Sequence, residues 1–166
     1  MILGMSFSTF TTLHVIISLI GIVTGLVALL GMLGGKTLGG WTATFLATTV
    51  LTSVTGFLFP FAKLLPSHVV GIISLAVLAA ALLALYVFRL DGPWRWIYVV
   101  GAVLALYLNV FVGVVQAFQK LAFLQPLAPT QVEAPFIVAQ AAVLALFAVL
   151  GFLALKRFHP QATALA

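Results

Sequence analysis

The sequence contains no cysteine, and its only acidic residues are Asp91 and Glu133. Without cysteine there are no disulfides, thiolate metal sites, iron–sulfur clusters or covalent haem attachments through a Cys-x-x-Cys-His motif. Hydrolytic and phosphoryl-transfer sites need acid–base pairs, and a divalent-metal site needs carboxylates beside its histidines. Neither acid lies inside an apolar run. These absences argue against an enzyme, and we assign no catalytic residue and no metal-binding residue.

Charge is also scarce. Of the 166 residues, 5% are charged and 64% are apolar, and the mean hydropathy is +1.34. A soluble domain needs many more polar residues to cover its surface, whereas a helix in a bilayer needs ~20 apolar residues. We therefore expect a single membrane domain over residues 1–166, with the lipid bilayer as partner. The net charge of +5 does not indicate nucleic acid, because the basic residues stand singly between apolar segments.

Five apolar runs are long enough to cross a bilayer, and they occupy residues 11–33, 41–60, 67–88, 94–118 and 135–155. They must be helices, because an open sheet would leave unpaired backbone groups in lipid. The predicted fold is an all-α integral membrane protein with five transmembrane helices. With the N-terminus outside, five basic residues lie on the inner face and two, Lys63 and Lys120, on the outer face. The positive-inside rule favours this orientation.

Two local motifs bear on how these helices start and pack. Gly21 and Gly25 form a Gly-x-x-x-Gly motif, which marks a close helix contact either within the chain or with another subunit. Thr130 to Glu133 reads "TQVE", which fits a capping box before the fifth span, although Pro135 competes as a first-turn residue.

Two of the three histidines begin similar segments. "HVIISLIGIVTGLVALLGMLGGKTLGGW" runs from His14 to Trp41, and "HVVGIISLAVLAAALLALYVFRLDGPW" runs from His68 to Trp94. Each contains about twenty apolar residues, a cation, a glycine turn and a tryptophan that opens the next span. This pattern predicts two hairpins related by a parallel repeat, with the fifth span added. The histidines then lie at matching depth near the outer boundary, on parallel helices that can be diagonal in a bundle.

Such a histidine pair suits six-coordinate haem b, which needs two imidazole ligands, apolar walls and cations for its propionates. Lys63 and Lys120 are the candidate cations, because both are on the predicted outer side. The alternative is that His14 and His68 are separate interfacial anchors or capped polar residues. The chain has no deeper histidine pair, so it could not alone carry electrons across the membrane.

Further polar residues gather in the outer half of the predicted bundle: Thr52, Thr55, Asn109, Gln116 and Gln140. Polar side chains in a membrane usually face the bundle interior, so we predict a polar pocket open to the outside. The alternative for the threonines is a closely packed face that bonds its own backbone. A small passive transporter or channel through this layer is a further hypothesis.

"GWTATFLATTVLTSVTGFLFPF", "LPSHVVGIISLAVL" and "WRWIYVVGAVLALYLNVFVGVVQAF" resemble segments of small multi-pass inner-membrane proteins of proteobacteria that have no assigned function. The resemblance covers most of the chain, and it implies a bacterial inner-membrane location but no activity and no site residue. The positive-inside orientation then places the C-terminus in the cytoplasm. The broad prediction is a non-enzymatic membrane protein that forms a homo-oligomer or serves as a subunit or accessory factor of a larger membrane complex. The specific alternatives are a b-type haem protein in electron transfer, with axial ligands His14 and His68, and the passive transporter.

Overall fold

The computed structural model describes residues 2–60 and 66–160. Lys63, one of the two predicted haem cations, lies outside the described residues. The described residues form helices joined by turns and short connections. In chain order these are α1 (Phe7–Leu33), α2 (Gly39–Gly56), α3 (Pro66–Leu82), the π-helical turn η1 (Leu83–Val87), α4 (Trp94–Lys120), the 3-10 turn η2 (Gln125–Leu127) and α5 (Ala134–Arg157).

Within the described residues, four helical segments are long and apolar enough to cross a membrane: α1, His68–Val87, α4 and α5. These spans confirm the prediction of an all-α membrane protein. α2 is not among the four, because six of its 18 residues are threonines, which lower its mean hydropathy. Large apolar side chains are exposed along the outer faces of the helices, where lipid tails would surround them.

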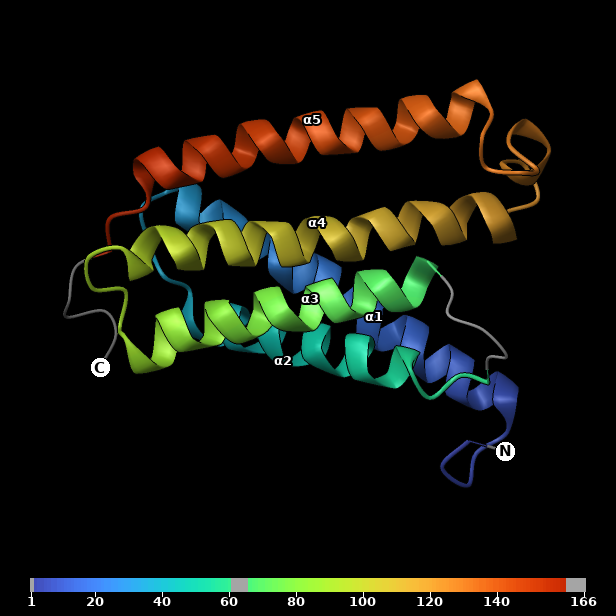
Figure 1. Cartoon of the computed structure of the whole chain (residues 1–166), viewed down its shortest axis with the longest axis horizontal. Helices are drawn as coiled ribbons and strands as arrows, with labels where there is room; N and C mark the ends of the chain where they lie inside the picture. The colour runs from blue at the N-terminus through green and yellow to red at the C-terminus, as the bar shows by residue number, and fades with distance from the viewer. Residues whose placement is uncertain (1, 61–65, 161–166) are drawn as a thin grey trace.

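The first four helices form a bundle, in which α1 and α3 each pack against both α2 and α4. α1 and α3 run in the same direction and lie diagonally, while α5 covers α4 and the C-terminal part of α1 (Figure 1). The start of α1 and the end of α5 lie at opposite ends of the bundle (Figure 1). We call these the N-terminal end and the C-terminal end of the bundle.

The core fills the half of the bundle nearer the C-terminal end, where α1, α2 and α4 meet closely at Gly25. A Cβ atom on Gly25 would lie 2.6 Å from Leu106 Cδ1 and 2.7 Å from Phe45 Cδ2, so only glycine fits. A Cβ atom on Gly21 would lie 3.1 Å from Asn109 Nδ2. The Gly-x-x-x-Gly motif therefore makes its close contacts within this chain.

Basic residues are concentrated at the C-terminal end of the bundle. Arg95 Nη1 donates to the carbonyl oxygens of Leu155, at 3.0 Å, and Phe158, at 2.8 Å, so a cation satisfies carbonyls at the end of α5. Of the basic residues that the structure describes, Lys120 is at the opposite end, and the others are Lys36, Arg89, Arg95, Lys156 and Arg157.

Four of the five helices start before the predicted residue, at Phe7, Gly39, Pro66 and Ala134, and local contacts explain the first and the last. α1 begins at Phe7, before the predicted residue 11, because the Ser6 hydroxyl accepts a hydrogen bond from the Thr9 amide at 3.1 Å. α5 begins at Ala134 with a proline in its first turn, so the capping-box interpretation of Thr130 is wrong. The Glu133 carboxylate instead accepts from the Thr130 hydroxyl, at 2.7 Å, in the turn before the helix, and this bond lowers the pKa of Glu133.

Candidate functional site

A cavity of about 490 Å³ lies among α1, α2, α3 and α4 in the half of the bundle nearer the N-terminal end. This volume is within the range of small-molecule and cofactor sites. All four helices contribute polar side chains to its wall. These are Thr11, His14, Ser18, Thr49, Thr52, Ser53, His68, Ser74, Asn109, Gln116 and Lys120.

Both repeat histidines line this cavity, and they come from the two diagonal helices. His14 of α1 is half-buried, and its ring meets the Phe59 ring edge to face at 5.2 Å. His68 of α3 is only 5% exposed, and its ring lies 5.7 Å from the ring of Phe57. The structure thus brings two imidazoles from opposite sides of the bundle to one cavity.

The hydrogen bond between His14 and Thr55 fixes which nitrogen of His14 carries the proton. The Thr55 hydroxyl lies 2.8 Å from His14 Nδ1 and donates at 2.6 Å to the carbonyl oxygen of Leu51. A hydroxyl has one proton, and the carbonyl can only accept, so Thr55 accepts from the Nδ1–H of His14. In the neutral ring, Nε2 then keeps its lone pair and can accept a proton or bind a metal.

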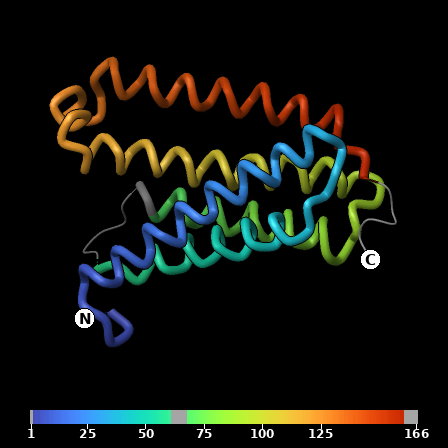
Figure 2. The backbone as a smooth tube through the Cα atoms, turned by 180° about the vertical axis from the view of Figure 1, so that it is seen from behind, coloured from blue at the N-terminus to red at the C-terminus, as the bar shows by residue number. Residues whose placement is uncertain are grey.

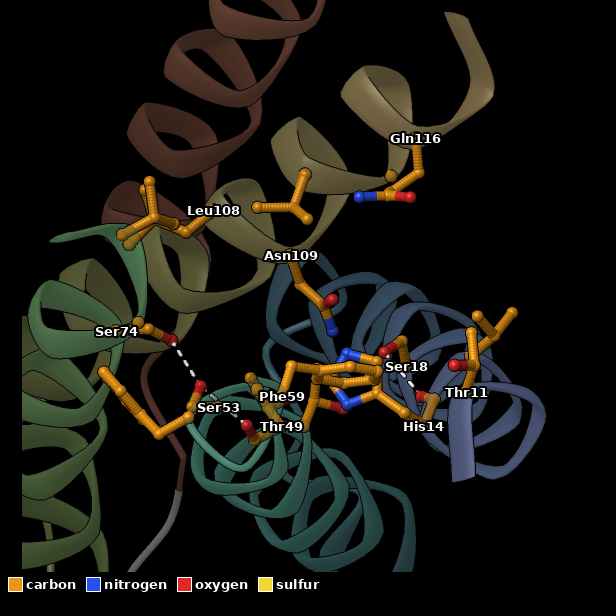
Figure 3. A pocket seen from close by; sticks show the side chains of 18 of the residues that line it. Thr11, His14, Ser18, Thr49, Ser53, Phe59, Ser74, Leu108, Asn109 and Gln116 are labelled. Atoms are coloured by element: carbon orange, nitrogen blue, oxygen red, sulfur yellow. Dashed lines mark hydrogen bonds between the residues drawn. The ribbon is translucent and has the colours of Figure 1, made fainter. Parts of the chain in front are cut away.

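Two polar atoms in the cavity wall have no hydrogen-bond partner among the described residues: Asn109 Nδ2 and Thr52 Oγ1. Asn109 is 9% exposed, and Figure 3 shows its amide pointing from α4 into the cavity, toward α1 and α2. An unpaired buried amide costs about 1–3 kcal/mol, and such a group in a native protein needs an explanation. A bound ligand or a water molecule on the cavity floor would provide one.

The other hydroxyl groups in the cavity wall are largely bonded to their own helices. Thr11, Ser18 and Thr49 each donate to the carbonyl oxygen four residues earlier, at 2.7–2.8 Å. Ser53 and Ser74 are joined across α2 and α3 at 3.2 Å (Figure 3). Backbone bonding, which the sequence analysis kept as the alternative for the threonines, therefore describes most of these hydroxyls, and Thr52 is the exception.

The remaining predicted site residues are split between the cavity and its surroundings. Gln116 and Lys120 are exposed and line the cavity near the end of α4. Thr55 is not in the wall but bonds His14. Gln140 lies apart from the cavity, because its Nε2 donates to the carbonyl oxygen of Phe111 and joins α5 to α4.

The site residues predicted from the sequence do not include five polar residues of the cavity wall, Thr11, Ser18, Thr49, Ser53 and Ser74. Helical spacing could have identified Ser18, because it lies four residues after His14 and thus on the same face of the helix. Ser74 gives no comparable signal, because its part in the wall depends on how α3 rotates against α2.

The cavity ends toward the middle of the bundle. Beyond its floor, Phe45, Leu46 and Leu106 are each about 1% exposed and fill the space among the helices. The site is therefore a blind pocket in this conformation. The described residues contain no group of three His, Cys, Asp or Glu side chains that could hold a metal ion.

Comparison of the chain with protein-family models, with curated proteins and with solved structures finds no match.

Proposed function

We propose that this chain is a non-enzymatic protein of the bacterial inner membrane that holds haem b in the cavity, with His14 and His68 as axial ligands. The observation that carries the proposal is that two histidines from diagonal helices line one cavity. If His14 and His68 were separate interfacial anchors, they would not need to line the same cavity.

The residues of the cavity fit the chemistry of haem. The Nδ1–H of His14 is held by Thr55, which orients the ring and presents Nε2 as a ligand. Ile22, Leu108 and Val112 provide apolar wall for a porphyrin face. Lys120 at the rim is a cation suited to a propionate. When bound, haem supplies one-electron redox chemistry whose potential depends on such ligands and on burial.

The topology proposed with this function has α2 as a fifth span and the N-terminus outside. α2 lies between α1 and α3 in the bundle, so a membrane that surrounds those helices also contains α2. Basic residues predominate at the C-terminal end, which supports a cytoplasmic location for that end. The α1–α2 and α3–α4 hairpins, with a histidine near the start of α1 and of α3, support the parallel repeat.

The position of the site limits the electron transfer that the protein can support. The third histidine, His159, is exposed at the opposite end of the bundle, so the chain offers one histidine pair only. Electrons would therefore enter and leave near the outer face, through a partner. This supports a role as subunit or accessory factor of a larger complex. The blind end of the cavity argues against a passive channel.

Haem binding can be tested by the visible spectrum of the detergent-purified protein after haem supplementation. We expect a Soret band in the wild type and its loss in the double variant His14→Ala/His68→Ala. His159→Ala is the matched control and should keep the band, because His159 follows the end of α5 and does not line the cavity. The proposal is wrong if the wild type shows no band or if the double variant keeps it.

Replacing Thr55 by valine should weaken haem binding by about 10–100-fold, the usual effect of losing a group that orients a ligand. Valine keeps the shape of threonine but cannot accept the Nδ1–H of His14. Thr44→Val is the control, because Thr44 makes the same backbone bond on α2, to Gly40, away from the cavity. Haem titration followed by absorbance measures the haem affinities of both variants. Equal affinities in Thr55→Val and Thr44→Val would show that Thr55 does not orient His14.

A further inference from the structure

The walls of the cavity are unequally buried. On the side of α2 and α3, Thr49, His68 and Ser74 are at most 5% exposed. On the side of α1 and α4, Leu19 is 55% exposed, and Gln116 is also exposed. The cavity is therefore open between α1 and α4.

The two helices that border this opening diverge toward the N-terminal end of the bundle. A Cβ atom on Gly25 would lie 2.6 Å from Leu106, one on Gly21 would lie 3.1 Å from Asn109, and one on Gly113 would lie 3.6 Å from Ile22. The second and third contacts lie nearer the N-terminal end than the first. Figure 2 shows the N-terminal half of α1 continuing away from α4.

The opening lies at the depth of the lipid tails. Leu19 is twelve residues after Phe7, which is about 18 Å along α1 at ~1.5 Å per residue. Helix α1 has 27 residues and spans about 40 Å, more than the ~30 Å of the hydrocarbon core. Leu19 therefore faces hydrocarbon rather than water. Val15 is also exposed and is a second apolar side chain on the α1 side of the opening.

Aromatic rings pack at the end of the cavity that faces water. Phe59, which follows α2, meets the rings of Phe7, at 5.8 Å, Phe10, at 5.1 Å, and His14, at 5.2 Å. These contacts tie the start of α1 to the end of α2. They narrow the direct path between the cavity and the aqueous side.

We propose that the cavity exchanges its ligand with the outer leaflet of the membrane, sideways through the opening between α1 and α4. This inference rests on the proposed haem function and names the source of the haem as the lipid phase. A flat apolar molecule with an anionic edge fits the route. Its body passes Val15 and Leu19, and its anionic edge meets Lys120 at the head-group level, where Lys120 ends α4.

The test is the rate of haem uptake by the haem-free protein in liposomes whose lipid contains haem, followed by growth of the Soret band. Leu19→Trp should slow uptake by about tenfold or more relative to the wild type, because the indole fills the opening. Leu30→Trp is the matched control, because Leu30 is exposed on the same helix outside the cavity wall. It should load at the wild-type rate.

Equal uptake rates in Leu19→Trp and Leu30→Trp would overturn the sideways route. Faster uptake in Phe59→Ala from haem supplied in water, with no effect of Leu19→Trp, would place the route at the aqueous end instead. A wild type that acquires no Soret band would overturn the haem proposal itself, so the two failures are distinguishable.

Discussion

Replacing Gly25 with leucine is expected to lower the free energy of unfolding by about 1–3 kcal/mol, the range for overpacking a well-filled core. The first added carbon alone would lie 2.6 Å from Leu106 and 2.7 Å from Phe45. Both neighbours are about 1% exposed, so neither can move into free space. The variant must therefore separate α1 from α2 and α4.

Gly113→Ala is the control for the effect of Gly25. Gly113 also lies in a transmembrane helix, but its Cβ would meet only Ile22, at an ordinary contact distance of 3.6 Å. Alanine there should be neutral or stabilising by up to about 1 kcal/mol, because alanine favours helix over glycine. Reversible denaturation in detergent, followed by circular dichroism, measures both changes. Equal stability in Gly25→Leu and the wild type would contradict the close helix contact.

Replacing Asn109 with leucine is expected to affect stability and haem binding in opposite directions. The Nδ2 group has no partner among the described residues, so removing it should raise the stability of the haem-free protein by about 1–3 kcal/mol. The same change removes a hydrogen-bond donor from the cavity floor. Haem affinity should then fall by about tenfold, which corresponds to the loss of one hydrogen bond made through a water molecule on the cavity floor.

Gln140→Leu is the control for Asn109→Leu, because it also removes a buried amide but outside the cavity. Gln140 also has an unpartnered buried atom, Oε1, but it does not line the cavity. Its replacement should leave haem affinity unchanged. If Asn109→Leu and Gln140→Leu bind haem equally well, Asn109 has no part in the site.

The membrane character and the helices were predictable because hydropathy alone determines them. Four of the expected spans appear as long apolar helices, whereas α2, rich in threonine, does not reach the same hydropathy. The helix starts were harder, because they depend on local hydrogen bonds. Ser6 extends α1, and Glu133 bonds a turn rather than the helix itself.

The composition of the site followed only in part from the sequence. Matching depth on parallel helices predicts which histidines can share a cavity, but not how each helix is rotated. Rotation puts Ser74 into the wall and turns Gln140 toward Phe111 instead. The proton on His14 Nδ1 depends on a contact with Thr55 in another helix, which no single-helix pattern reveals.

The electron paramagnetic resonance spectrum of the ferric, haem-supplemented protein tests the central claim most directly, because it reports the axial ligands of the iron. We expect a low-spin signal typical of two imidazole ligands in the wild type and in His159→Ala. Each of the single variants His14→Ala and His68→Ala should lose that signal and become high-spin. A bis-imidazole signal that survives in either single variant would contradict ligation by this histidine pair.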